Sequence, residues 1–175
     1  MEDVALGEPG ELIARGHGIM QGYYNKPAET AAAITLDGWL HSGDLAVETP
    51  DGYYRITGRI KDMIIRGGEN IYPREIEEFL YTHPQVADVQ VVGLPDEKFG
   101  EEVCAWIRVK PGAPPSEDEV RVFCRTGLAH YKVPRYVVFV DEYPTTVTGK
   151  VQKFRLRELG VERFGLRKAA SVETA

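Results

Sequence analysis

The chain is poor in the features that mark disulfide-stabilised and metal-binding proteins. Among its 175 residues it has two cysteines, Cys104 and Cys124, with no CxxC pair and no histidine at a metal-ligand spacing. This pattern excludes a disulfide framework and gives no metal site. Both cysteines lie in apolar segments, so we expect reduced thiols in or near the core of a cytoplasmic protein.

Long hydrophobic runs and an excess of positive charge are also missing. The longest apolar stretch, residues 86–94, is interrupted by Asp88 and Gln90 and is far too short to cross a bilayer. The formal net charge of -6 gives no attraction to nucleic acids or anionic membranes. The acidic start of the chain has no apolar stretch of signal-peptide length. We therefore expect neither a membrane span nor general nucleic-acid binding.

What the chain does contain is an ordinary globular composition, 43% hydrophobic and 27% charged, with apolar material for one or two modest cores. The first third is rich in glycine turns, and it predicts strands at 12–14 and 53–57 around a short helix at 28–34. This part is expected to be β-rich.

After Arg59 the pattern changes to alternating strand and helix signals. Two short apolar arms flank Gly67-Gly68, which predicts a hairpin, and Ser116 with Glu119 forms a capping box that opens a helix. The expected elements are this hairpin, a helix from 73 to before 84, strands at 86–94 and 102–109, a helix at 116–125, a strand at 137–140 and a helix at 152–159.

These signals predict an α+β fold class. We expect a small C-terminal domain with a short mixed sheet and flanking helices, preceded by a β-rich end piece of another domain. The predicted boundaries are 1–60 for the β-rich piece, 61–165 for the small domain and 166–175 for a frayed tail.

Four short segments carry the candidate chemistry: GWLHSGDL at 38–45, GRIKD at 58–62, RGGEN at 66–70 and PTTVTGK at 144–150. In this order and spacing they resemble the adenylate-forming superfamily of acyl- and aryl-CoA synthetases, luciferases and peptide-synthetase adenylation domains. The stretch RGHGIMQGYYNKP near the start is typical of the acyl-CoA synthetase branch. The resemblance extends from Gly7 to about Leu159.

The first candidate site consists of Asp44 and Arg59. On its own, Ser-Gly-Asp indicates an Asx turn, and an isolated arginine usually pairs with surface acids. A carboxylate can also accept hydrogen bonds from both hydroxyls of a ribose. The resemblance implies that Asp44 binds the ribose of ATP and that Arg59 lies beside the nucleotide.

The second group surrounds the predicted hairpin. The resemblance implies that Lys61 is the hinge about which the C-terminal domain rotates between two half-reactions. It also implies that Gly67, Gly68 and Glu69 line the channel for the pantetheine arm of coenzyme A, where glycine permits close backbone approach. The alternative is that Gly67 and Gly68 only form the turn of a hairpin and bind no ligand. Arg66 either contacts coenzyme A or has no role.

Lys150 is the candidate catalytic residue. A lysine in a polar loop is usually an exposed surface charge. The resemblance implies that its ammonium contacts both the attacking carboxylate and the α-phosphate of ATP, where it stabilises developing negative charge. The six basic residues near the C-terminus are interpreted as the solvated face of the last helix, with contact to the 3'-phosphate of coenzyme A as the lesser alternative: Lys153, Arg155, Arg157, Arg163, Arg167 and Lys168.

The expected function is therefore that of an AMP-forming acyl-CoA ligase, which makes an acyl-adenylate and then a thioester, with a medium-chain fatty acid as the expected substrate. ATP, Mg²⁺ and coenzyme A are the expected cofactors and co-substrates. The superfamily's phosphate-binding loop, acyl pocket and Mg²⁺ site precede the part seen here. We expect the chain to belong to a longer protein, to need that missing N-terminal domain as its partner, and to be inactive alone.

Two alternatives remain at this point. One is an adenylation domain that hands its product to a carrier protein, although only about 25 residues follow Lys150. The other is a stand-alone, non-catalytic C-terminal module.

Overall fold

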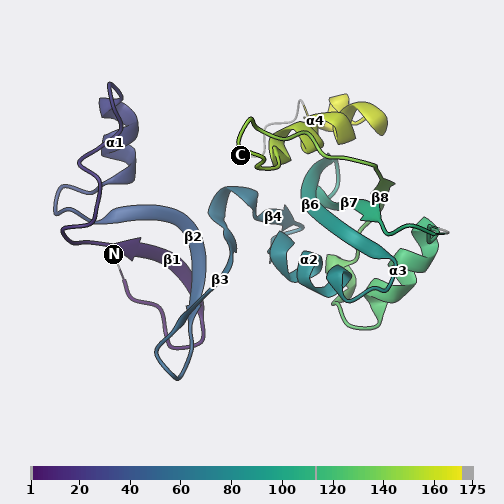
Figure 1. Ribbon diagram of the computed structural model, residues 1–175, viewed down its shortest axis with the longest axis horizontal. Helices are drawn as coiled ribbons and strands as arrows, with labels where there is room; N and C mark the ends of the chain where they lie inside the picture. Colours follow the sequence, from purple (N-terminus) through teal and green to yellow (C-terminus); the bar gives the residue numbers. More distant parts are fainter. Residues whose placement is uncertain (1, 113, 171–175) are drawn as a thin grey trace. The chain divides into compact units, whose positions relative to one another are not determined.

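The computed structural model describes residues 2–112 and 114–170. The chain divides into two compact units, Met1–Lys61 and Asp62–Ala175. Most of their elements are labelled in Figure 1.

The first unit is an antiparallel three-stranded sheet with one short helix. Its elements are β1 (Pro9–Ala14), α1 (Pro27–Ala33), β2 (Leu40–Glu48) and β3 (Tyr54–Arg59), followed by a 3-10 turn, η1 (Ile60–Asp62). The sheet order is β1-β2-β3. Among the described residues of this unit only Ala46 is buried, at 6% exposure. The unit therefore has almost no core of its own.

The central strand, β2, was absent from the sequence prediction. Its segment Ser42-Gly43-Asp44 consists of residues that usually form turns. Pairing with β1 at His41 and Leu45, and with β3 from Asp44 onward, holds this segment within the strand as a bulge, because long-range ladder hydrogen bonds outweigh local turn preference.

The second unit is an α+β domain built on a five-stranded sheet, as predicted. Its elements in chain order are β4 (Ile64–Arg66), β5 (Glu69–Ile71), α2 (Pro73–Tyr81), β6 (Val86–Asp96), β7 (Gly100–Val109), α3 (Glu117–Arg125), η2 (His130–Lys132), β8 (Tyr136–Phe139), α4 (Lys153–Arg163) and α5 (Arg167–Ala170). The sheet order is β5-β4-β7-β6, and β8 also pairs with β7. Only the β7–β8 pairing is parallel, so the predicted mixed sheet is confirmed.

Both faces of this sheet are covered by helices (Figure 1). Successive residues of a strand point to opposite faces, so Val91 of β6 joins the core beneath α2 and α3, whereas Val92 joins the core beneath α4. The first core includes Ile76 of α2 and Val120 of α3, and the second includes Leu156 of α4. The two cores therefore fix the helices against the sheet that carries the Gly67-Gly68 corner.

The local signals read from the sequence are confirmed at two places. Ser116 caps α3, because its hydroxyl accepts from the amide of Glu119 at 3.2 Å while the Glu119 carboxylate accepts from the amide of Ser116 at 2.7 Å. Cys104 and Cys124 are both free and buried. Burial raises the pKa of the Cys104 thiol to about 12 and that of the Cys124 thiol to about 11, so neither thiol is ionised near neutral pH.

The tail predicted to be frayed from residue 166 contains the short helix α5 at Arg167–Ala170, and residues 171–175 lie outside the described part. Within the described residues, none of the helices combines the length and the apolar character that a membrane crossing requires.

Candidate functional site

Asp44 is presented by an irregular segment of β2. Between two regular pairings with β1, Glu11↔Leu45 and Ile13↔His41, strand β2 uses two more residues than β1 does, which makes a bulge that contains Asp44. Gly43 lies in the left-handed region with φ of 72°, a conformation that glycine adopts without strain.

Hydrogen bonds to β1 hold this bulge in place. The Ser42 hydroxyl donates to the Leu12 carbonyl at 2.5 Å and accepts from the Asp44 amide at 3.0 Å. The Glu11 carboxylate accepts from the Gly43 amide at 3.0 Å. The motif therefore has a fixed shape that orients the Asp44 side chain.

Asp44 and Arg59 are brought together by the β2–β3 pairing. They are directly opposite each other in the register, and Arg59 Nε donates to Asp44 Oδ1 at 2.7 Å. The side chains remain 30% and 54% exposed, respectively. Among the described residues, neither Asp44 Oδ2 nor the terminal guanidinium nitrogens have another hydrogen-bond partner. Asp44 Oδ2 could therefore accept a hydrogen bond from a ribose hydroxyl, while the neighbouring Arg59 guanidinium could bind a phosphate.

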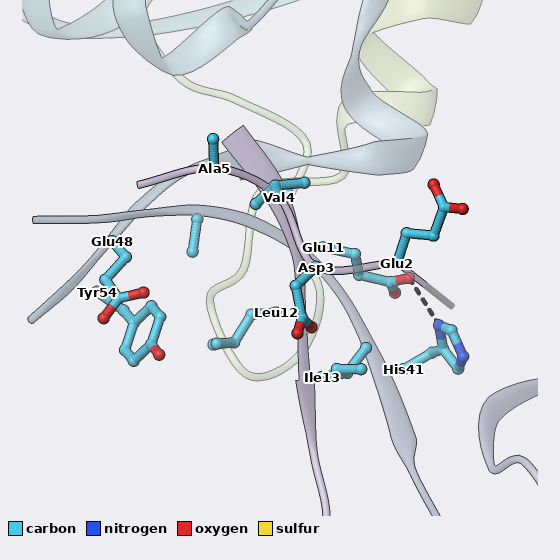
Figure 2. Close-up of a pocket in the computed structure, with 12 residues that line it drawn as sticks. Glu2, Asp3, Val4, Ala5, Glu11, Leu12, Ile13, His41, Glu48 and Tyr54 are labelled. Atoms are coloured by element: carbon cyan, nitrogen blue, oxygen red, sulfur yellow. Dashed lines mark hydrogen bonds and ion pairs between the residues drawn. The ribbon is translucent and has the colours of Figure 1, made fainter. Parts of the chain in front are cut away.

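The face of the same sheet also contains a cavity of about 570 Å³. Figure 2 shows His41 at its side, with Nδ1 lying 2.6 Å from Glu11 Oε2. The lining includes the acids Glu2, Asp3, Glu11 and Glu48 but not Asp44 or Arg59. Because carboxylates repel phosphates, this cavity is a poor nucleotide site. The pair on β2 and β3 is the better candidate.

Lys61, the predicted hinge, lies in the short turn η1 and is exposed. The boundary between the two compact units falls directly after it. A residue that absorbs a rotation must have few packing constraints, and the position of Lys61 meets this condition. The hinge role itself stays a prediction.

Gly67 and Gly68 form the two-residue corner between β4 and β5, as the pattern predicts. Their φ angles are 59° and 88°, and positive φ at both positions is what a type I' hairpin turn requires. A Cβ on Gly68 would meet no atom within 4 Å, whereas one on Gly67 would lie 3.3 Å from the Phe99 ring. The corner and the neighbouring Glu69 are exposed, so the backbone there is accessible to a narrow ligand.

Arg66 has a structural role that its sequence context did not indicate. It donates two hydrogen bonds to Glu102, at 2.8 and 2.9 Å, and its guanidinium lies 4.3 Å above the centre of the Phe99 ring. The bonds to Glu102 raise the pKa of Arg66 above its ordinary value. The Arg66 side chain is therefore held by Glu102 and Phe99, beside the Gly67-Gly68 corner.

Lys150 lies at the end of a tight loop that the sequence identified as polar. Residues 145 and 151 form a β-bridge, and Thr146 bonds Lys150 in both directions: its amide donates to the Lys150 carbonyl at 2.8 Å and its hydroxyl accepts from the Lys150 amide at 3.1 Å. The side chain is exposed, and its ammonium has no ion pair with any described residue. The Lys150 ammonium is therefore available to bind a ligand, and the hydrogen bonds of the loop hold its backbone in place.

Two basic residues anchor the helix that follows this loop: Lys153, which is 24% exposed and was wrongly interpreted as solvated, and Arg157, which makes its contacts from an exposed position. Lys153 Nζ lies 2.7 Å from Glu77 Oε1 of α2 and donates to the Val91 carbonyl at 3.2 Å. Arg157 pairs with Glu101 of β7 and donates to the Gly93 carbonyl. Both side chains donate to carbonyls of β6, whose outer edge pairs with no strand in the described part of the chain. Arg157 stays 44% exposed, and Arg155, Arg163, Arg167 and Lys168 are exposed as well, as the solvated interpretation predicts.

The predicted site residues therefore occupy two separate places. Asp44 and Arg59 form one pair in the first unit, and the glycine corner and Lys150 belong to the second. Within residues 2–112 and 114–170, no group of three or more His, Cys, Asp or Glu is arranged to hold a metal ion, so the described residues do not fit a Mg²⁺ site.

Three comparisons relate this geometry to known proteins. Residues 75–150 match the AMP-binding enzyme C-terminal domain family. The chain is 59% identical, over 94% of its length, to the Bacillus subtilis protein named "Putative acyl-CoA synthetase YngI", and 54% identical, over 87% of its length, to the mitochondrial medium-chain acyl-CoA ligase ACSF2 of Bos taurus. It spans 30% and 25% of these two relatives.

Among solved structures, the chain resembles the o-succinylbenzoate CoA synthetase MenE of Bacillus subtilis, which was crystallised with its acyl-adenylate intermediate. The TM-score is 0.80 at 34% identity, and the match covers 88% of this chain and 31% of the other. The α+β fold class read from the sequence is thereby supported by a protein of known structure.

Proposed function

Because residues 75–150 belong to the AMP-binding enzyme C-terminal domain family, we propose that this chain is the C-terminal portion of an ATP-dependent acyl-CoA ligase. The observation that carries the proposal is the identity to acyl-CoA synthetases and ligases over nearly the whole chain. The near absence of a core in the first unit also fits an end piece that completes a larger domain. In this proposal the chain needs that larger domain for activity.

In the first half-reaction, a carboxylate attacks the α-phosphate of ATP and pyrophosphate leaves. Asp44 accepts from the ribose through its free oxygen, and the Arg59 guanidinium faces the phosphate side. The exposed ammonium of Lys150 meets the two anions as they approach and offsets their repulsion. In this half-reaction ATP is held in part by residues of this chain.

In the second half-reaction, the thiol of coenzyme A attacks the acyl carbonyl and AMP leaves. The second unit rotates about Lys61 between the two steps, which moves the Lys150 loop away and brings the Gly67-Gly68 corner to the adenylate. Two glycines and Glu69 then border the path of the pantetheine arm. The accessible hairpin corner supports this assignment, because a side chain there would narrow the path.

The proposed acid is a medium-chain fatty acid, since the relative from Bos taurus carries that specificity in its name. A carrier-protein thiol in place of coenzyme A is the alternative acceptor. The cytoplasmic location stays a prediction.

The test uses the full-length protein that carries this chain, with ATP, coenzyme A and acids of increasing chain length. Formation of AMP and an acyl-CoA thioester, fastest with medium-chain acids, is the expected result. The variants Asp44→Asn and Arg59→Gln should each raise the KM for ATP about tenfold or more, which corresponds to the loss of a hydrogen bond to a charged group. An active protein that ignores coenzyme A but loads a carrier protein would overturn the acceptor assignment, and the absence of adenylation with every acid would overturn the proposal.

A further inference from the structure

The β4–β5 hairpin that carries the glycine corner has few backbone attachments to the rest of its sheet. Its two strands have three residues each, and β4 pairs with β7 at one position, Arg66↔Gly100. The Gly67 amide adds one hydrogen bond to the Phe99 carbonyl at 2.8 Å. An isolated two-stranded hairpin is marginally stable in water. Side-chain interactions must therefore fix its position.

Glu101 of β7 supplies the first of these interactions. Its Oε2 accepts from the backbone amide of Ile65 in β4 at 2.9 Å. Its other oxygen pairs with Arg157 of α4, which also donates to the Gly93 carbonyl at 2.7 Å. The Glu101 side chain is 19% exposed. One carboxylate thus joins the hairpin to the helix that follows the Lys150 loop.

Glu102, the next residue, supplies the second interaction. Its side chain is 3% exposed and receives the two hydrogen bonds from Arg66. Arg135 lies 3.5 Å from the same carboxylate and 2.9 Å from Asp96. Burial alone would raise the pKa of Asp96, but the amides of Phe99 and Lys98 and the charge of Arg135 outweigh it and lower that pKa. The Asp96 carboxylate is therefore ionised at neutral pH.

Successive residues of a strand point to opposite faces of the sheet. Glu101 and Glu102 therefore reach β4 from its two faces, one through a backbone amide and the other through a buried side chain. Removing one partner from a buried ion pair is far more damaging than removing one from an exposed pair. The two acids together restrict the tilt of the hairpin and the position of its corner.

We propose that Glu101 and Glu102 are positioning residues for the thioester-forming half-reaction, which hold the Gly67-Gly68 corner where the thiol of coenzyme A must approach. The inference rests on the proposed function for its activity readout. Neither residue touches a reacting atom. Their effect falls on the second step because both acids bond β4 of the hairpin directly, whereas only Glu101 also contacts α4, through Arg157, and neither bonds residues 145–150 of the Lys150 loop.

The test compares Glu101→Gln and Glu102→Gln in the full-length protein, with Glu117→Gln as the matched control. Glu117 forms an exposed pair with Arg121 on α3, so its loss is expected to change neither step. For the two test variants, pyrophosphate exchange should stay within about twofold of wild type, since adenylation does not use the hairpin. Thioester formation from adenylate at saturating coenzyme A should fall about tenfold to a hundredfold, the range that a misplacement of about 1 Å produces.

A second measurement does not depend on activity. Hydrogen exchange on the 175-residue chain should be faster at the amides of residues 64–71 in both test variants, and unchanged at the β6–β7 pairing. Arg66→Lys keeps the charge but loses the bidentate contact with Glu102. Its rate of thioester formation should therefore lie between the rates of wild type and Glu102→Gln. If Glu102→Gln does not fold, the same two measurements on Glu101→Gln, where the side chain is less buried, test the positioning role.

The outcomes separate the two proposals. Equal loss of both half-reactions, no loss of either, or unchanged exchange at residues 64–71 would overturn the positioning role. A wild-type protein that adenylates no acid would overturn the proposed function instead, and faster hairpin exchange in the variants would then still support the attachment by Glu101 and Glu102.

Discussion

Replacing Lys153 by methionine is expected to destabilise the second unit by about 2 kcal/mol. Methionine keeps the apolar stem but removes the ammonium that lies 2.7 Å from Glu77 Oε1. The two side chains are 24% and 16% exposed. Exposed pairs contribute about 0–1 kcal/mol, and breaking a fully buried pair costs about 3–5 kcal/mol. The exposure of this pair places its value between these limits.

The backbone contacts of the pair narrow the estimate. Glu77 Oε1 also accepts from the Val91 amide at 2.8 Å, and Lys153 Nζ donates to the Val91 carbonyl. After the substitution Glu77 keeps one partner, so its charge is only partly unpaired. A double-mutant cycle with Glu77→Gln should give a coupling energy of roughly 1–2 kcal/mol.

Urea unfolding monitored by Trp106 fluorescence provides the assay, because Trp106 lies in the core beneath α4 and is 4% exposed. The substitution Trp39→Phe in all samples removes the other tryptophan, which belongs to the first unit. Additive single effects, with a coupling energy below about 0.5 kcal/mol, would show that the Lys153–Glu77 pair does not stabilise the unit and that Lys153 acts as a solvated surface residue.

Three further predictions concern the second unit. Ser116→Ala should cost about 1 kcal/mol in urea unfolding, since it removes the cap of α3, and no change would contradict the capping role. Gly160→Ala should destabilise the unit despite the better helix propensity of alanine, because its Cβ would lie 2.6 Å from a methyl of the fully buried Leu94; a higher melting temperature would show that Leu94 can move. Cys104 and Cys124 should react with a thiol reagent at pH 8 only after unfolding, since burial keeps both thiols protonated, and rapid labelling of the native chain would contradict this.

The element order of the second unit could be predicted because its signals are local. The cap at Ser116, the proline at the start of α2 and the two glycines of the hairpin each act within one turn of the chain. Strand β2 could not be predicted in the same way. Its Ser-Gly-Asp bulge is held within the strand by pairing with strands on both sides.

The candidate residues came from a resemblance of motifs, which carries no information about their partners. The Asp44–Arg59 ion pair joins residues 15 positions apart, and the Arg157–Glu101 pair joins residues 56 positions apart. Charge patterning along a helix identifies neighbours at three or four residues only. For this reason the sequence does not indicate that the exposed Arg157 pairs with Glu101, and the two adjacent acids of β7 carry no signal at all.

We propose that Lys150 serves the adenylation step of an acyl-CoA ligase. The most direct measurement is ATP–pyrophosphate exchange by the full-length protein with a medium-chain acid, for wild type, Lys150→Ala and the control Lys26→Ala, whose lysine is an exposed partner of Glu29. Exchange should fall about a hundredfold or more in Lys150→Ala and stay at the wild-type level in Lys26→Ala. Lys150→Ala should still form the thioester at a near-normal rate from preformed acyl-adenylate and coenzyme A. Undiminished exchange in Lys150→Ala would mean that Lys150 has no role in adenylation.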